Sequence, residues 1–353
     1  MGELVGVAHG KLYRWYKDHL SGFTKPDSQK KLHQHDIVRS ETDRKTGKPE
    51  VVRVPILKSE NMGPDMCIDE KYIGGEFYTL LANRQTGKIA LMAGTQNTVE
   101  LCELMVKFEL DKRFGVKYLT RDLLNAYDWT GRQMFLNAEH IADKFHILQH
   151  LFDAVQSIRI YHRNVYLTKR RQAYEAFKAK EAERKIHCQS MNETFHPAVF
   201  QHKEERLENG ETNRELLARS VHLLYKFSGQ WNSSQSIRAE ILFKHYPDIH
   251  TAYKLCCSFR EWYSKEYIGQ PIKKIMKRLN IWFDKVKSTG MEEMRNFKSL
   301  VERHLGVILN YFKDGRTNAN AESLNAKIQR FLQANNGARD LDFTFFRLAN
   351  FFA

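Results

Sequence analysis

The sequence predicts an α/β core joined to a large all-helical region. Residues 65–145 alternate between strand-like and helix-like patterns, whereas the chain from Phe145 to about Phe312 has an almost entirely helical pattern. A loop and one more amphipathic helix follow. With 353 residues, of which 42% are apolar, the chain is long enough for two domains or for one domain with a large insertion.

The first 60 residues predict a helix followed by an arm. Residues 1–20 carry Leu12, Trp15 and other apolar side chains at helical spacing, and Gly22 is a plausible end. Residues 23–60 are polar and contain Pro26, Gly47, Pro49 and Pro55, which indicates a linker or extended arm. This stretch is too short for an independent helix-turn-helix or zinc module.

Residues 61–145 predict five strands and two helices. The stretch from Met66 to Ile73 forms a first strand that carries Asp69, and aromatic and branched residues around an Asn83–Gly87 turn predict a hairpin after it. The elements expected next are a helix at 98–112, a strand at 116–120, a helical stretch around 123–127 and a strand at 138–142.

Three aspartates occupy positions that favour ligand binding. Asp69 lies on the first strand, and a strand fixes its side chain more firmly than a loop does. Asp122 and Asp143 each follow the carboxyl end of a short strand, where α/β sheets place ligand-binding groups. The alternative for Asp69-Glu70 is the solvated end of a strand.

The helical region, residues 146–312, contains a basic segment. Residues 156–185 hold nine Lys or Arg against three Glu, and Lys169, Arg170 and Arg171 are consecutive. Two interpretations stay open: a helix that contacts phosphates, and a solvated helix face with aromatic core anchors. Three tryptophans are expected in the core of this region: Trp231, Trp262 and Trp282.

The last part, residues 313–353, carries a helix at 321–331 after a loop rich in capping residues. Leu324, Ile328, Phe331 and Leu332 form its apolar stripe. Its polar edge holds Glu322, Asn325 and Gln329, and Lys327 and Arg330 lie further round. A glutamate in the first turn of a helix is commonly only a complement to the helix dipole.

Composition limits the partner and the compartment. A net charge of +14 and a pI near 9.4 favour a polyanionic partner, most simply nucleic acid. The five cysteines lack a CxxC pair, which indicates no disulfide framework and no cysteine zinc site. Mean hydropathy of −0.57, no long apolar run and no signal-peptide core predict a cytoplasmic protein without a membrane span.

Asp69, Asp122 and Glu322 together predict a metal site. Carboxylates brought together from separate elements can flank two hard cations, which take oxygen ligands and serve phosphodiester chemistry.

Four motifs in order resemble the DDE transposases of bacterial insertion sequences, of the ISL-three type, which have a ribonuclease-H-like fold. The matching stretches are Ile68-Asp69-Glu70 with Phe77-Tyr78-Thr79, Thr120-Arg121-Asp122, Ala142-Asp143-Lys144-Phe145-His146, and Asn318 with Glu322, Asn325 and Ile328. The resemblance covers about residues 65–350. One departure is Lys144, where the family more usually has arginine.

The resemblance implies a ribonuclease-H-like mixed sheet with a large all-α insertion between the fifth strand and the final catalytic helix. It implies that Asp69, Asp122 and Glu322 bind two Mg²⁺ ions, for which Mn²⁺ can substitute. The enzyme would cleave transposon ends and transfer the 3′-OH into target DNA. The expected supporting or DNA-binding residues are Asp143, His146, Asn318, Asn325, Lys327, Arg330, Lys169, Arg170 and Arg171. For Asp143 and His146, a capped helix start with a core histidine is the alternative.

The expected partners are transposon-end and target DNA, with a homo-oligomer, most simply a dimer, because two DNA ends must be paired. A separate chain can supply the N-terminal DNA-binding region, because some relatives split the two parts. The expected location is the bacterial nucleoid. Two other functions stay open: a ribonuclease-H-like nuclease without strand transfer, and an inactive transposase derivative that only binds DNA.

Overall fold

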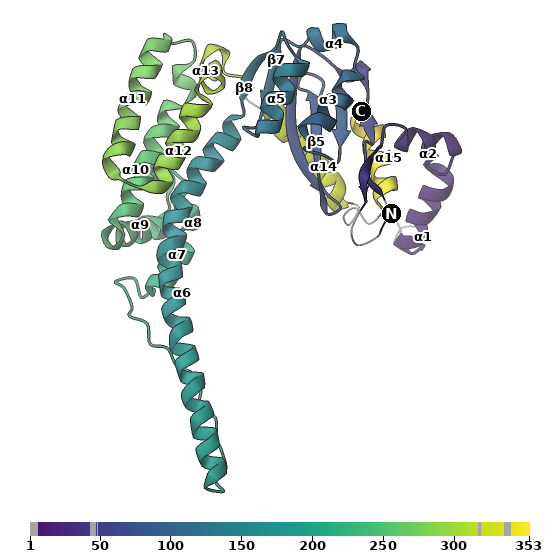
Figure 1. Cartoon of the computed structure of the whole chain (residues 1–353). Helices are drawn as coiled ribbons and strands as arrows, with labels where there is room; N and C mark the ends of the chain where they lie inside the picture. Colours follow the sequence, from purple (N-terminus) through teal and green to yellow (C-terminus); the bar gives the residue numbers. More distant parts are fainter. Residues whose placement is uncertain (1–5, 43–46, 48, 317–318, 335–339) are drawn as a thin grey trace. The chain divides into compact units, whose positions relative to one another are not determined.

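The computed structural model describes residues 6–42, 47, 49–316, 319–334 and 340–353, without the side chains of residues 9, 41, 42 and 319–322. The chain divides into two compact units (Figure 1). The sheet unit comprises residues 1–147 and 304–353, and the helical unit comprises residues 148–303.

The sheet unit is built on a six-stranded mixed sheet with strand order β3-β6-β5-β4-β7-β8. Its strands are β3 (Ile56–Leu57), β4 (Asp65–Ile73), β5 (Glu76–Asn83), β6 (Ile89–Ala93), β7 (Tyr118–Arg121) and β8 (Glu139–Ala142). β4, β5 and β6 are antiparallel neighbours, whereas β7 and β8 run parallel to β4. The predicted five strands are confirmed, and β3 is an additional edge strand. The arrangement is compatible with a ribonuclease-H-like transposase fold.

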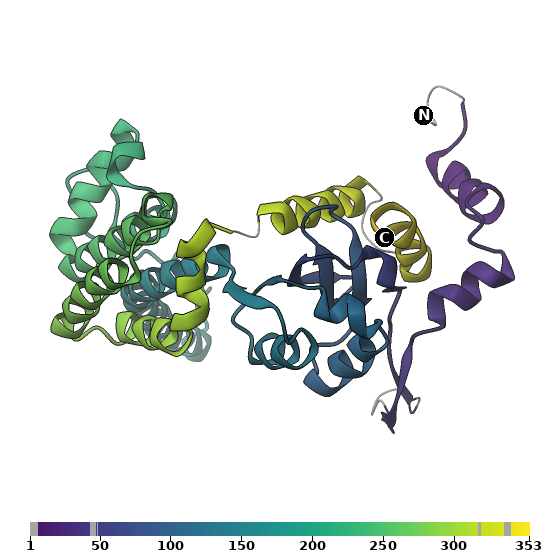
Figure 2. The same cartoon turned by 90° about the horizontal axis from the view of Figure 1, so that it is seen from above.

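Helices cover both faces of this sheet (Figure 2). On β4, Cys67 packs with α14 (Ala319–Ala334) and α15 (Leu341–Phe352), while Met66 and Ile68 pack with α3 (Thr98–Val106) and α5 (Asn125–Met134). Because side chains alternate along a strand, Asp69 and Lys71 share the face that carries α14. The predicted apolar stripe of α14 is confirmed, since Leu324, Ile328 and Leu332 are buried and Phe331 packs, partly buried, against the same core.

The helix predicted at 98–112 is two helices, so that prediction is wrong in part. α3 ends at Val106 and α4 spans Leu110–Phe114. Glu109 has an extended backbone, and the buried Phe108 packs in the sheet core between the two helices. The burial of Phe108 therefore interrupts a stretch whose sequence pattern alone favours one continuous helix.

The N-terminal arm predicted for residues 23–60 is also wrong, because this stretch is folded. After α1 (His9–Trp15) and a π-helical turn (Tyr16–Leu20), the chain forms α2 (Pro26–His33) and an antiparallel pair, β1 (Ile37–Thr42) and β2 (Pro49–Val52). Phe23 and Leu32 are buried against the α14–α15 side of the core, and Val52 and Val54 against the other side. A few apolar side chains thus tie a mostly polar segment to the sheet unit.

The helical unit contains most of α6 (Lys144–Ser190) and six further α-helices. These are α7 (Asn213–Arg219), α8 (Val221–Leu224), α9 (Ser233–His245), α10 (Pro247–Trp262), α11 (Ile272–Thr289) and α12 (Glu292–Arg303). Trp262 and Trp282 are buried and donate to the carbonyls of Ile275 and Leu255, which confirms them as core anchors. Trp231 is only partly buried.

α13 (Leu305–Asp314) belongs to the sheet unit, although the sequence places residues up to 312 in the helical region. Asn310 Nδ2 donates to the carbonyl of His140 on β8 at 2.8 Å. Lys144 Nζ donates to Tyr311 Oη at 3.1 Å and lies over the same ring. These contacts fix α13 at the β8 edge.

Among the described residues, no helix is both long and apolar enough to cross a membrane.

Candidate functional site

Three aspartates form one row across the three parallel strands of the sheet. The register pairs Ile68 of β4 with Arg121 of β7, and Arg121 with Ala142 of β8. The residues that follow these three are Asp69, Asp122 and Asp143. All three side chains are at most 13% exposed. The strand register therefore gathers three carboxylates that are far apart in the sequence.

His146, in the first turn of α6, lies between these carboxylates. Its Nε2 is 3.6 Å from Asp69 Oδ1 and 3.8 Å from Asp143 Oδ2, and its Nδ1 is 3.8 Å from Asp122 Oδ2. Burial lowers the pKa of His146, but the three aspartates outweigh burial and raise that pKa to about 9. At neutral pH the ring is therefore a cation that offsets part of the negative charge.

The Asp69 carboxylate is held at both oxygens. Oδ1 accepts the backbone N–H of Glu70 at 2.8 Å, and Oδ2 accepts Asn325 Nδ2 of α14 at 2.5 Å. Lys71 lies on the same face of β4, where its Nζ donates to the carbonyl of Asn325 at 3.5 Å. Asn325 thus links α14 to the aspartate row, and Lys71 adds a cation beside Asp69.

Asp143 and Asp122 are fixed by their own loops. Asp143 Oδ1 accepts the N–H of Phe145 at 2.9 Å, next to the start of α6, and Asp122 Oδ1 accepts the N–H of Leu123 at 2.6 Å. Asp143 is also almost completely buried. Asp143 thus lies against both the start of α6 and the His146 ring, and its supporting role at the site stays a prediction.

Glu70 lies beside this row. Partial burial raises the pKa of Glu70, and the charges of Asp122 and Asp69 raise it further. Its carboxylate accepts a hydrogen bond from Gln96. Glu70 is thus a further acidic group close to the aspartates.

Two predicted site residues, Glu322 and Asn318, cannot be compared with the structure in full. The backbone of Glu322 belongs to α14, but its side chain lies outside the described residues, as does the whole of Asn318. The connection that leads to α14 is anchored to the sheet by Arg316. Its Nη1 donates to Asp65 Oδ2 at 2.8 Å, and its guanidinium lies 3.5 Å from the centroid of the Tyr118 ring.

The remaining predicted residues are exposed. Lys327 and Arg330 are exposed on α14, where Arg330 Nε donates to the carbonyl of Ala326 at 3.3 Å. Lys169, Arg170 and Arg171 are exposed on α6, in the helical unit. None of these five forms an ion pair in the part of the chain that the structure describes.

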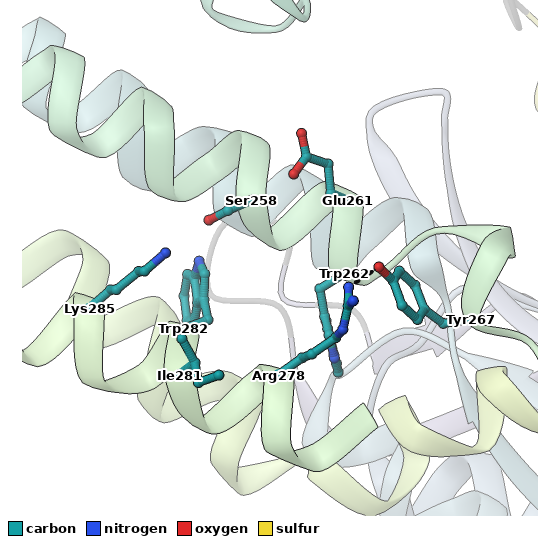
Figure 3. A pocket seen from close by; sticks show the side chains of 8 residues that line it. All are labelled: Ser258, Glu261, Trp262, Tyr267, Arg278, Ile281, Trp282 and Lys285. Carbon is teal, nitrogen blue, oxygen red and sulfur yellow. Dashed lines mark hydrogen bonds between the residues drawn. The ribbon is translucent and has the colours of Figure 1, made fainter. Parts of the chain in front are cut away.

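No group of three or more His, Cys, Asp or Glu side chains among the described residues is arranged to hold a metal ion. The position of the His146 ring between the aspartates is consistent with this result. A hollow of about 160 Å³ lies elsewhere, in the helical unit (Figure 3). Glu261 is the one carboxylate that lines it, beside Arg278 and Lys285, so it does not provide paired carboxylates for cations.

Comparison with known families decides the class of protein. The family model of ISL-three-type DDE transposases, described as "Transposase", matches residues 66–348. The chain belongs to this transposase family. Comparisons with curated proteins and with solved structures gave no match. The match spans the aspartate row and α14 of the transposase, and family membership makes it a nucleic-acid-processing enzyme that binds DNA.

The sequence motifs missed Lys71 and Arg316. Lys71 could have been found from strand alternation alone, since it lies two residues after Asp69. Arg316 had no such signal, because its partners Asp65 and Tyr118 come from distant strands of the transposase.

Proposed function

We propose that this transposase cleaves DNA at transposon ends and transfers the cut strand into target DNA, using Asp69, Asp122 and Glu322. The observation that carries the proposal is the row of Asp69 and Asp122 on neighbouring parallel strands, with Asn325 of α14 bonded to Asp69. Glu322 is three residues before Asn325 on the same helix, and residues three apart share a helix face.

The case for Mg²⁺ rests on the chemistry of the donor atoms, because the described side chains by themselves do not form a metal-binding group. Asp69, Asp122 and Asp143 present oxygen atoms around one cationic ring, and hard divalent cations prefer oxygen ligands. We propose that Asp69, Asp122 and Glu322 hold two Mg²⁺ ions, which Mn²⁺ can replace. When bound, the ions supply activation of the attacking oxygen and stabilisation of the leaving oxygen.

The neighbouring side chains have supporting roles. Asn325 and the Glu70 N–H fix the orientation of the Asp69 carboxylate, so that its oxygens need little reorganisation. His146 balances the charge of the row with its proton. Lys71 provides a cation on the face of Asp69, suited to a scissile phosphate.

We also propose that the active form is a dimer and that the helical unit is an insertion into a ribonuclease-H-like core. Pairing two DNA ends calls for two copies of the site. A separate chain that supplies an N-terminal DNA-binding region remains part of the proposal, as an addition to the exposed basic side chains of α6.

The test is cleavage by the Asp69→Asn variant. A labelled duplex that carries the DNA flanking the protein's own gene is incubated with Mg²⁺ or Mn²⁺. We expect metal-dependent nicking by the natural protein and a loss of about 10³-fold or more in the variant, with DNA binding retained. Asp111→Asn, an exposed aspartate on α4, is the matched control and should cleave normally.

Two results would change the proposal. Undiminished cleavage by Asp69→Asn would show that the metal assignment is wrong. Nicking without joined products, measured with a target plasmid in the same reaction, would point to a nuclease without strand transfer.

A further inference from the structure

A second charged cavity lies in the helical unit, where α6 faces the chain that returns along it. Its volume is about 480 Å³, within the range of ligand sites. In Figure 1 the C-terminal part of α6 extends beyond the neighbouring helices, and the following segment runs back beside it. The lining residues come from α6, residues 200–206 and the start of α7: Arg170, Phe200, His202, Lys203, Glu204, Arg206, Thr212, Arg214 and Glu215.

Three cations of this cavity have no acidic partner. Arg170, Lys203 and Arg206 are exposed and form no ion pair with any carboxylate of the described residues. Arg206 Nη1 instead donates to the carbonyl of Gly210 at 2.6 Å. The two lining carboxylates are engaged by other residues of the cavity wall: Glu204 pairs with Arg214 at 3.2 Å, and Glu215 accepts the N–H of Thr212 at 3.0 Å. The cavity therefore has a net positive charge available to a ligand.

The same cavity has an aromatic wall. The Phe200 ring lies parallel to His202, with 10° between the planes and 6.2 Å between the centroids. Its other contacts are with Tyr174 and Phe177 of α6, at centroid distances of 5.1 and 5.4 Å. Those two contacts hold Phe200 in place against α6. An aromatic ring fixed beside unpaired cations is the combination that binds single-stranded nucleic acid, through base stacking and phosphate contacts.

We propose that this cavity binds an unpaired stretch of DNA. Backbone phosphates contact Arg170, Lys203 and Arg206, and a base packs against Phe200 and His202. Of the three consecutive basic residues, only Arg170 is assigned to this binding site, because Lys169 and Arg171 do not line the cavity. It rests on the proposed function only in that the ligand is DNA.

The test measures binding of a fluorescent single-stranded oligonucleotide and of a blunt duplex by the full chain, in EDTA, at several salt concentrations. EDTA keeps cleavage out of the measurement, so failure of the carboxylate proposal leaves this result intact. In the cavity variant Arg170, Lys203 and Arg206 are all changed to Gln. Its matched control changes Lys178, Lys180 and Lys185 to Gln, which removes the same charge from exposed positions of α6 outside the cavity.

We expect the cavity variant to bind single strands at least about tenfold more weakly at moderate salt. The plot of log affinity against log salt should become shallower, its slope decreasing in magnitude by about 2, because each of the three lost phosphate contacts contributes about 0.7. The control should lose less than about threefold. Phe200→Leu keeps an apolar contact with Tyr174 and Phe177 but removes the stacking face. It should weaken single-strand binding by about fivefold or more without changing the slope.

Equal losses in the cavity variant and the control would overturn the proposal, because the effect would then belong to the general basic surface. Equal losses for blunt duplex and single strand would overturn it as well, because no unpaired base would be involved. Unchanged circular dichroism and melting temperature identify the variants that fold; if Phe200→Leu unfolds, His202→Ala, at an exposed position, replaces it.

Discussion

The aspartate row of the sheet unit and the cavity beside α6 carry opposite charge in opposite surroundings. The aspartates lie on or directly after neighbouring strands with at most 13% of each side chain exposed, and a protonated histidine lies between them. The cations of the cavity are exposed and have no acidic partner among the described residues. Buried charges require a counterion, whereas exposed ones are compensated by water and salt. The first region thus favours cations held at fixed positions, and the second favours a ligand that exchanges readily.

The Asp122→Asn variant distinguishes most sharply between the role of the aspartate row in cleavage and the role of the cavity in DNA binding. This change removes one charge from the row while the cavity stays intact. We expect cleavage to fall by about 10³-fold or more and DNA affinity to change by less than about threefold. Single-turnover cleavage and anisotropy on the same DNA measure the two effects. A parallel loss of affinity and cleavage would mean that the two regions do not act separately.

Arg121 tests how much the buried residue before Asp122 contributes to stability. Arg121 is fully buried, pairs with Asp128, and donates to His140 Nδ1 at 3.3 Å and to the carbonyl of Asp122 at 3.1 Å. Arg121→Met removes all three contacts, although Asp128 keeps its ion pair with Arg132. We expect a loss of about 2–4 kcal/mol in the free energy of unfolding. Thermal unfolding measures it. Asp122→Asn, one residue along, should lower the melting temperature much less. Equal losses for the two variants would contradict a larger contribution from Arg121 than from Asp122.

A smaller effect is expected from pH. The pKa of His146 is about 9 in the folded protein and about 6.5 when unfolded, so its proton stabilises the fold fully below pH 6.5. That contribution is lost as the pH rises through 9. In EDTA, we expect unfolding free energy to fall by about 1–2 kcal/mol between pH 6.5 and 9.5, allowing for partial solvent exposure. Denaturant titration across this range measures it.

His146→Gln is the control for the pH effect. It removes the titrating group, so the difference between pH 6.5 and 9.5 should shrink in this variant. A pH dependence equal to that of the natural protein would assign the effect to another group. The control separates His146 from the lysines, which also titrate at high pH.

The strand positions that carry the aspartate row were predictable from the sequence. The apolar run before Asp69 and the short strands before Asp122 and Asp143 have clear patterns, and alternation assigns their faces. Their proximity was not determined by any local pattern. It depends on the parallel register of β4, β7 and β8, which is set by pairing between distant segments.

Other features depended on contacts that leave little trace in local sequence. The segment 23–60 folds because Phe23, Leu32 and Val54 are buried, although prolines and polar residues surround them. The cavity beside α6 needs Phe200 and Arg206 from a segment without a regular pattern. The basic helix has a clear pattern in the sequence, whereas the returning chain that completes the cavity has none.

The measurement that tests the central claim most directly compares Glu322→Gln with the natural protein. Cleavage of the labelled transposon-end duplex is followed in Mg²⁺, with Glu292→Gln, an acid in the first turn of α12, as the matched control. The assignment of Glu322 to the metal site predicts metal-dependent nicking by the natural protein and the control, and a loss of about 10³-fold or more in Glu322→Gln. Normal nicking by Glu322→Gln would contradict it, because α14 would then contribute no carboxylate to the site.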